Sequence, residues 1–178
     1  GRPLHWSMNT KLVLFMTAVL LSLGFVAFLA FEWTNTKTLA SMPLLDRLQV
    51  AMFQSVQART AGFNSVDFAD VRAETLLSFD ILMFIGGGPA GTAGGIKVTT
   101  FAVLLFILLT ELRGQGAVNI FGKRLSRSVH REALTIALLA SAAVVGGTLI
   151  LLVTSHKDLD VILFEAVSAF GTVGLSTG

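Results

Sequence analysis

Two short segments of small and apolar residues share the pattern Thr-x-Gly and lie 112 residues apart. The first reads TAGF (residues 60–63) and the second TVGL (residues 172–175). Their side chains offer no acid–base or nucleophilic chemistry, but backbone carbonyl oxygens can replace the water around a cation, and Gly permits the positive φ that such a turn requires. One copy alone would favour an ordinary glycine turn between helices, whereas two copies in matching surroundings favour a cation-coordinating backbone. The candidate residues are Thr60, Ala61, Gly62, Phe63, Thr172, Val173, Gly174 and Leu175.

A short apolar helix is expected before each segment. The pattern predicts one helix over residues 43–57, with Pro43 in its first turn, and another over residues 160–170, with Asp160 as its N-cap. Their closing sequences, FQSVQA and FEAVSA, also match after a gap of one residue. Helices of this length are too short to cross a bilayer and indicate re-entrant segments, whose partly negative C-terminal ends would point at the ion.

The composition determines the class of protein. Of 178 residues, 53% are hydrophobic and only 13% are charged, against about 25% in soluble domains. There is no cysteine, which excludes disulfides and thiolate metal sites. Apolar stretches at residues 12–31, 76–112 and 132–155 predict three membrane spans, and the second is too long for one straight crossing. The sequence therefore predicts an all-α integral membrane fold.

The sequence MFIGGGPAGTAGGIKVTTF (residues 83–101) interrupts the overlong stretch, and we expect it to break the helix. Gly and Pro disfavour helix by about 1 and 3 kcal/mol each. A phosphate-binding loop would need Gly-Lys-Ser/Thr, which is missing here. Lys97 would lie inside the membrane, where a lysine must face protein or water. It would be either a structural anchor or a cationic element near the ion path. The candidate loop residues are Gly86, Gly87, Gly88, Pro89, Gly91, Gly94, Gly95 and Lys97.

The charges predict an orientation in the membrane. Five of the basic residues lie in the loop at residues 113–131, which the positive-inside rule places in the cytoplasm. The opposite side is acidic. There Asp67 and Asp70 follow the first Thr-x-Gly segment and would concentrate cations at an outer mouth; a solvated loop without a role is the alternative.

Together, RTAGFNSVDF, MFIGGGPAGTAGGIKVTTF and FEAVSAFGTVGLSTG resemble the pore subunits of TrkH/KtrB-type potassium transporters over essentially the whole chain. The resemblance implies four M1–P–M2 repeats around one pseudo-fourfold pore. The chain would hold the third repeat (residues 1–115, filter 59–64) and the start of the fourth (residues 116–178, filter 171–176). It further implies that the filter backbone binds K⁺ and that the glycine-rich loop gates the pore. The expected partners are a second pore subunit in a homodimer and a cytoplasmic nucleotide-binding ring of the KtrA/TrkA type.

The expected function is therefore potassium transport across the cell membrane by a multi-pass protein in the lipid bilayer. No covalent chemistry, covalent cofactor or nucleic-acid partner is expected, so the protein is not predicted to be an enzyme. K⁺ is the substrate and Na⁺ a candidate coupling or activating ion. The alternative is a non-conducting membrane scaffold in which the glycines allow close helix packing. A nucleotide-binding membrane enzyme is a third class, which the missing phosphate-loop motif disfavours.

Overall fold

The computed structural model describes residues 7–59, 61–63, 65–88, 94–114, 119–120, 123–124 and 126–178. In these ranges the chain is all-helical apart from one hairpin of two-residue strands, which confirms the predicted class. The elements are α1 (Met8–Glu32), α2 (Leu44–Gln57), α3 (Ala73–Phe84), α4 (Val98–Leu112), β1 (Asn119–Ile120), β2 (Lys123–Arg124), α5 (Arg127–Thr154) and α6 (Leu159–Phe170).

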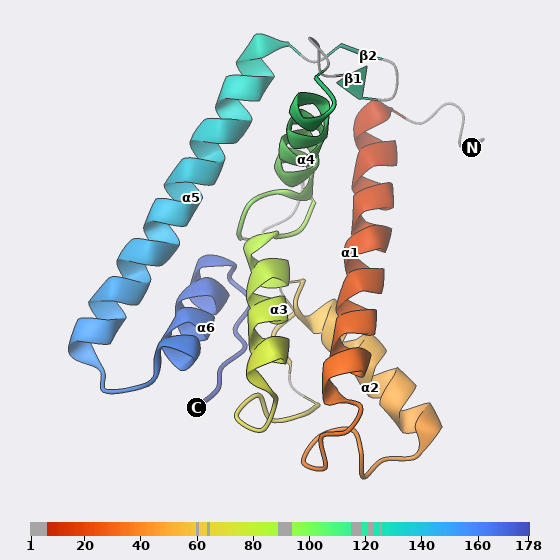
Figure 1. The fold of residues 1–178 in the computed structure, drawn as a ribbon, viewed down its shortest axis with the longest axis vertical. Helices are drawn as coiled ribbons and strands as arrows, with labels where there is room; N and C mark the ends of the chain where they lie inside the picture. Colours follow the sequence, from red (N-terminus) through yellow and green to blue (C-terminus); the bar gives the residue numbers. More distant parts are fainter. Residues whose placement is uncertain are drawn as a thin grey trace.

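Two long helices, α1 and α5, run along the two sides of the molecule and cover most of its height (Figure 1). In the described part of the chain, both are long and apolar enough to cross a membrane by length and composition. Only 28% of the most apolar window of α1 and 17% of that of α5 is buried inside the structure. The apolar surfaces of both helices therefore mostly face outward, unlike those of a core helix in a soluble protein.

The overlong apolar stretch at residues 76–112 is divided into α3 and α4, which lie one above the other in the middle of the molecule (Figure 1). The chain leaves the end of α3 and returns beside it through a single β-bridge between Ile85 and Ile96. The Gly86 amide donates to the Ile96 carbonyl at 2.8 Å, and the Ile96 amide donates to the Phe84 carbonyl at 2.9 Å. The glycine-rich segment between Ile85 and Ile96 is called the excursion below, and the bridge that joins its two ends is called its neck.

The short helices α2 and α6 start at the same end of the molecule and stop near mid-height (Figure 1). Two details of their starts differ from the prediction. Pro43 is the N-cap of α2, because its extended backbone (ψ 156°) lies outside the helix. Asp158, not Asp160, is the N-cap of α6; Asp160 lies in the first turn, where its carboxylate accepts from the Val161 amide at 2.9 Å. A carboxylate is also favourable there, near the positive end of the helix dipole.

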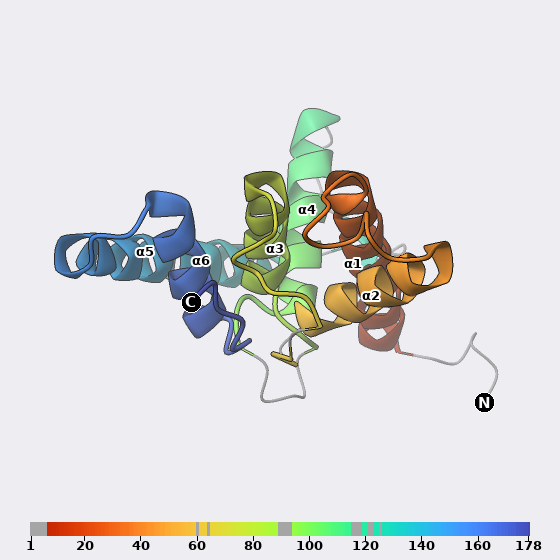
Figure 2. The same ribbon diagram turned by 90° about the horizontal axis from the view of Figure 1, so that it is seen from below.

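A row of buried phenylalanines joins the two halves of the chain. Phe28 of α1 packs edge-on against Phe79 of α3, with ring centroids 5.7 Å apart. Phe68, in the loop after α2, contacts Phe79 at 5.3 Å and Phe164 of α6 at 5.2 Å. All four rings are fully buried. Seen from below, α1 and α2 lie on one side and α5 and α6 on the other, with α3 and α4 between them (Figure 2).

The apolar stripe of α2 faces outward, and its polar side faces inward. Gln54, Ser55 and Gln57 are buried together with Ala51. The Ser55 hydroxyl donates to the Leu21 carbonyl of α1 at 2.7 Å. The exposed apolar residues are Leu44, Leu45, Leu48, Met52, Phe53 and Val56. The inward polar side chains are therefore available to hold the backbone that follows the helix.

Candidate functional site

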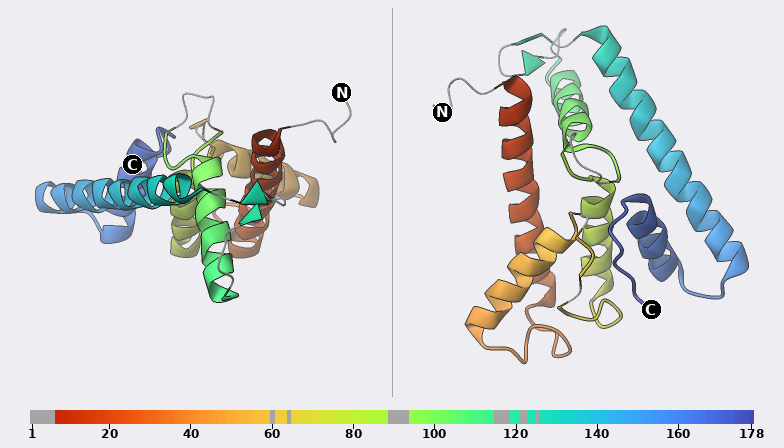
Figure 3. Two further views of the ribbon diagram at one scale, coloured as in Figure 1. Left: turned by 90° about the horizontal axis from the view of Figure 1, so that it is seen from above. Right: turned by 180° about the vertical axis from the view of Figure 1, so that it is seen from behind.

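The two Thr-x-Gly segments meet at the C-terminal ends of α2 and α6 (Figure 3, right). A methyl group added at Gly62 would lie 2.1 Å from the Val173 carbonyl oxygen, so only glycine fits there. Both central glycines have positive φ, 72° at Gly62 and 88° at Gly174. No described atom lies within 4 Å of a methyl group added at Gly174, so conformation rather than crowding favours glycine at that position.

In the first segment, the backbone after α2 is held by one glutamine side chain. The Phe63 amide donates to Gln57 Oε1 at 2.7 Å, and the Ala61 amide donates to the Gln57 carbonyl at 3.3 Å. The side chains of Ala61 and Phe63 are exposed, with Phe63 at 71%. Thr60 lies outside the described residues.

In the second segment, the side chains alternate between the interior and the surface. Val173 and Leu175 are buried, whereas Thr172 and Gly174 are exposed. The Ser168 hydroxyl donates to the Leu175 carbonyl at 2.6 Å, and the Val173 amide donates to the Ser168 carbonyl at 2.9 Å. Thr172 has φ 53°, a conformation that β-branched residues rarely adopt and that marks local strain.

Two further helix positions, which the sequence reasoning missed, hold the chain beyond the glycines. Glu165 Oε1 accepts from the Ser176 hydroxyl at 2.6 Å and from the Thr177 amide at 2.9 Å. Gln54, in the amide orientation that satisfies both of its polar atoms, accepts from the Ser65 amide at 3.2 Å. Aligning FQSVQA with FEAVSA pairs Gln54 with Glu165 and Gln57 with Ser168. This match between the two helix ends is the sequence signal that could have identified both residues.

The end of the glycine-rich excursion lies against the start of the second segment. The Gly94 amide donates to Thr172 Oγ1 at 2.8 Å, and the Gly95 amide donates to the Phe170 carbonyl at 3.3 Å. A methyl group at Gly94 would lie 2.7 Å from the Gly171 carbonyl carbon, and one at Gly86 would lie 1.8 Å from the Gly94 carbonyl oxygen. These backbones are too close for any side chain between them.

The remaining residues predicted for this loop lie in several places. Gly87 accepts from the Val98 amide at 3.2 Å, and a methyl group at Gly88 would contact Val13 of α1 at 3.6 Å. Lys97 is half-buried and is the N-cap of α4. Pro89 and Gly91 lie outside the described residues.

The neck of the excursion is also tied to the first segment. Arg59 directly precedes that segment, and its Nη1 donates to the Ile85 carbonyl at 2.9 Å. Ile85 is the C-cap of α3, where a positive charge is favourable against the helix dipole. The excursion therefore contacts Arg59, the residue before the first Thr-x-Gly segment, and contacts the second segment itself through the hydrogen bond from Gly94 to Thr172.

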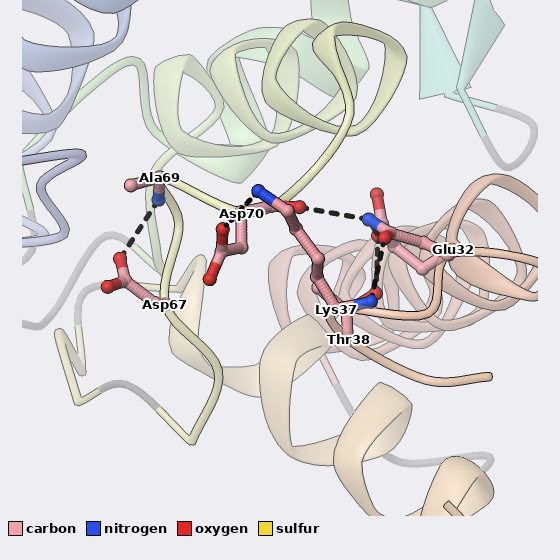
Figure 4. A network of polar contacts seen from close by, with 7 residues as sticks. Glu32, Lys37, Thr38, Asp67, Ala69 and Asp70 are labelled. Carbon is pink, nitrogen blue, oxygen red and sulfur yellow. Dashed lines mark hydrogen bonds and ion pairs between the residues drawn. The ribbon is translucent and has the colours of Figure 1, made fainter. Parts of the chain in front are cut away.

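Asp70 is joined through Asn35 to the buried carboxylate of Glu32, and Asp67 lies farther from that carboxylate (Figure 4). Glu32 is fully buried and accepts from Asn35, Thr38, the Arg72 amide and Thr75, which ties the end of α1 to the start of α3. Asp70 pairs with Lys37 at 3.0 Å, and Asp67 accepts from the Ala69 amide at 2.9 Å. Among the described residues, no group of three or more His, Asp or Glu is arranged to hold a metal ion.

The sequence matches the model of the TrkH family, described as a cation transport protein, over residues 5–178. The chain belongs to the TrkH family of cation transport proteins. It is 39% identical over 173 residues to the Ktr system potassium uptake protein B of Bacillus subtilis, covering 97% of this chain and 39% of that protein. The protein of the same name from Vibrio alginolyticus is 38% identical, with 98% of this chain and 40% of that protein covered.

A third member of the family, the potassium/sodium uptake protein NtpJ of Enterococcus hirae, is 35% identical over 97% of this chain and 39% of its own length. The chain thus spans about two fifths of the curated relatives that it matches. The predicted family is confirmed over nearly every residue of the chain.

Proposed function

We propose that the chain forms part of a potassium-conducting pore in which the two Thr-x-Gly segments coordinate the ion through backbone carbonyls. The observation that supports this most directly is the contact between Gly62 and Val173, at the ends of two short helices that start on the same side. Segments 112 residues apart in the sequence thereby become neighbours. The family, and the potassium uptake proteins among the relatives of this chain, support the same ion.

The physical basis is an exchange of water for backbone oxygen. A cation entering a narrow passage loses hydration, and carbonyl dipoles at fixed positions replace it. The C-terminal ends of α2 and α6 add partial negative charge near the segments. No bond is made or broken in this transport, so the proposal requires no catalytic residue and no covalent cofactor. Na⁺ is proposed as a coupling or activating ion, in line with the potassium/sodium name of one relative.

The glycine-rich loop is proposed as the gate of this pore. Its neck contacts Arg59, the residue before the first segment, and its tightly packed glycines allow the backbone to lie directly beside the second segment. We place the loop at residues 113–131 in the cytoplasm by the positive-inside rule. The proposed assembly is a homodimer in the bilayer with a cytoplasmic nucleotide-binding ring, for which the "Ktr system" names of the relatives offer support.

A non-conducting scaffold accounts less well for where the glycines lie. In such a protein we would expect the helix glycines to bring helices together. Within the described chain, methyl groups at Gly146 and Gly147 of α5 would contact nothing within 4 Å. One helix glycine does lie against another helix, because a methyl group at Gly24 of α1 would lie 2.6 Å from Ser55 Oγ of α2. The closest approaches to backbone atoms, however, involve Gly62, Gly86 and Gly94, where the backbone meets non-helical backbone.

The test is substitution of the two central glycines in the full-length protein. Gly62→Ser should abolish or strongly reduce rubidium uptake, because its Cβ would overlap the Val173 carbonyl oxygen. Gly174→Ser should weaken uptake or potassium/sodium discrimination less severely, since the strain of a left-handed residue costs about 1–2 kcal/mol. Gly146→Ser is the matched control. Wild-type uptake kinetics and ion selectivity in both filter variants would rule out the assignment.

A further inference from the structure

The matching helix ends FQSVQA and FEAVSA differ in charge at one position. Gln54 and Glu165 occupy matching positions on α2 and α6 and accept hydrogen bonds from matching backbone amides, those of Ser65 and Thr177. Ser65 and Thr177 are 112 residues apart, as are Gly62 and Gly174. One side chain is a neutral amide and the other is an acid.

Both side chains position the chain in the same way. Gln54 is fully buried and also accepts from the Ser65 hydroxyl at 2.9 Å and the Val66 amide at 3.3 Å. Glu165 is half-buried and accepts from the hydroxyls of Ser176 and Thr177 at 2.6 and 3.3 Å. The positioning role therefore requires an acceptor oxygen at this place on the helix but no charge.

The contacts of Glu165 fit an ionised carboxylate. It accepts three hydrogen bonds and donates none, as expected for the charged form. The partners of this carboxylate are the neutral donors of Ser176 and Thr177, and the Lys157 ammonium donates to the Gly178 carbonyl at the end of the same segment. Its negative charge is therefore available to act on a cation held by the neighbouring segment.

We propose that Glu165 both positions the second Thr-x-Gly segment and strengthens cation binding beside Gly174 by its charge. The proposal rests on the proposed potassium pore. It makes the two segments unequal: the first is held by a neutral anchor and the second by an anionic one. Because Glu165 is half-buried, salt screens it less than it screens a charge on the surface.

The experiment exchanges the two natural side chains in the full-length protein. Glu165→Gln keeps an acceptor for the Thr177 amide and removes the charge. It should raise the apparent KM for rubidium about fivefold, which corresponds to about 1 kcal/mol of lost attraction between the carboxylate and the cation, with little change in Vmax. Gln54→Glu should lower the apparent KM, and Glu165→Ala, which loses both roles, should also lower Vmax.

The controls separate charge from position. The effect of Glu165→Gln should persist at high ionic strength, unlike that of neutralising an exposed carboxylate. A wild-type KM in Glu165→Gln, or in Gln54→Glu if the first variant does not fold, would overturn the proposal and leave Glu165 as an anchor only. If wild-type protein transports no rubidium, or Gly62→Ser has no effect, the proposed pore itself fails. Normal transport with a defective Gly62→Ser variant and a silent Glu165→Gln variant would refute only the role of the charge.

Discussion

Asp67 and Asp70 were predicted together as an outer mouth, but the structure gives them different surroundings. Asp70 is paired with Lys37, which offsets much of its field. Asp67 is exposed, accepts one hydrogen bond from the Ala69 amide and has no ion-pair partner among the described residues. Asp67 is therefore expected to have the stronger influence on cations approaching from this side.

Neutralising each aspartate separately tests this difference. Asp67→Asn in the full-length protein should raise the apparent KM for rubidium about twofold at low ionic strength, because an exposed charge contributes about 0.2–1 kcal/mol. The effect should fade at high ionic strength, where the Debye length falls below roughly 10 Å. Asp70→Asn should change the KM less. Equal KM shifts at both ionic strengths would argue against electrostatic attraction as the cause.

Among the larger elements, the excursion between α3 and α4 combines a fixed neck with close contact to the second segment. The Ile85–Ile96 bridge and the Arg59–Ile85 hydrogen bond hold its base. The hydrogen bond from Gly94 to Thr172 joins its returning end to a residue with strained backbone. An element attached in this way can shift at one contact while its base stays in place, as a bistable switching element requires.

Shortening the loop within residues 89–93 leaves the neck and Gly94 unchanged. If the loop obstructs ions, rubidium flux should rise and depend less on the regulatory partner, with unchanged ion preference. Flux is measured in a host deficient in potassium uptake, normalised to membrane protein, with and without the partner. A fall in expression and flux together would mean that the loop is only a packing element.

Thr172→Val supplies a companion variant without a deletion. Valine keeps the shape of threonine but removes the acceptor for the Gly94 amide, and the loss of a typical hydrogen bond costs about 0.5–1.5 kcal/mol. The displaced loop should then be favoured and flux should rise in the same direction as with the shortened loop. Thr172→Ser retains the hydroxyl and is the control. Identical flux in the valine and serine variants would show that this hydrogen bond does not hold a gate.

At the scale of the whole molecule, helix α5 separates a basic end of the protein from an acidic end. Its 28 residues span about 42 Å at 1.5 Å per residue, more than the roughly 30 Å hydrocarbon core. Arg127 begins this helix beside the basic loop, and Asp158 follows its other end; both are exposed. In the proposed orientation, Arg127 is expected to lie in the cytoplasm and Asp158 outside.

The orientation can be measured because this chain contains no cysteine. In full-length protein freed of other cysteines, Asp158→Cys should react with a membrane-impermeant maleimide on intact cells. Arg127→Cys should react only after the cells are permeabilised. Labelling of Arg127→Cys on intact cells, with Asp158→Cys protected, would reverse the orientation.

The sequence by itself determined the features that depend on local composition and periodicity. The apolar stretches predicted α1 and α5, and the run of glycines with Pro89 predicted the break between α3 and α4. The short helices before both Thr-x-Gly segments could also be predicted, to within a few residues at their ends. The exact caps were not, because Asp158 and Asp160 both suit a helix start and differ only in the backbone that follows.

Only the tertiary structure decided which distant residues meet. It placed Gly62 against Val173, Gly94 against Thr172, and the polar side of α2 toward the backbone that it holds. It also revealed Gln54 and Glu165 as matching anchors. Such contacts form between residues far apart in the chain, and a glutamine or glutamate on a helix has the same local pattern whether it faces water or a backbone amide. Burial and hydrogen-bond partners are properties of the packed molecule, so they appear only when the helices come together.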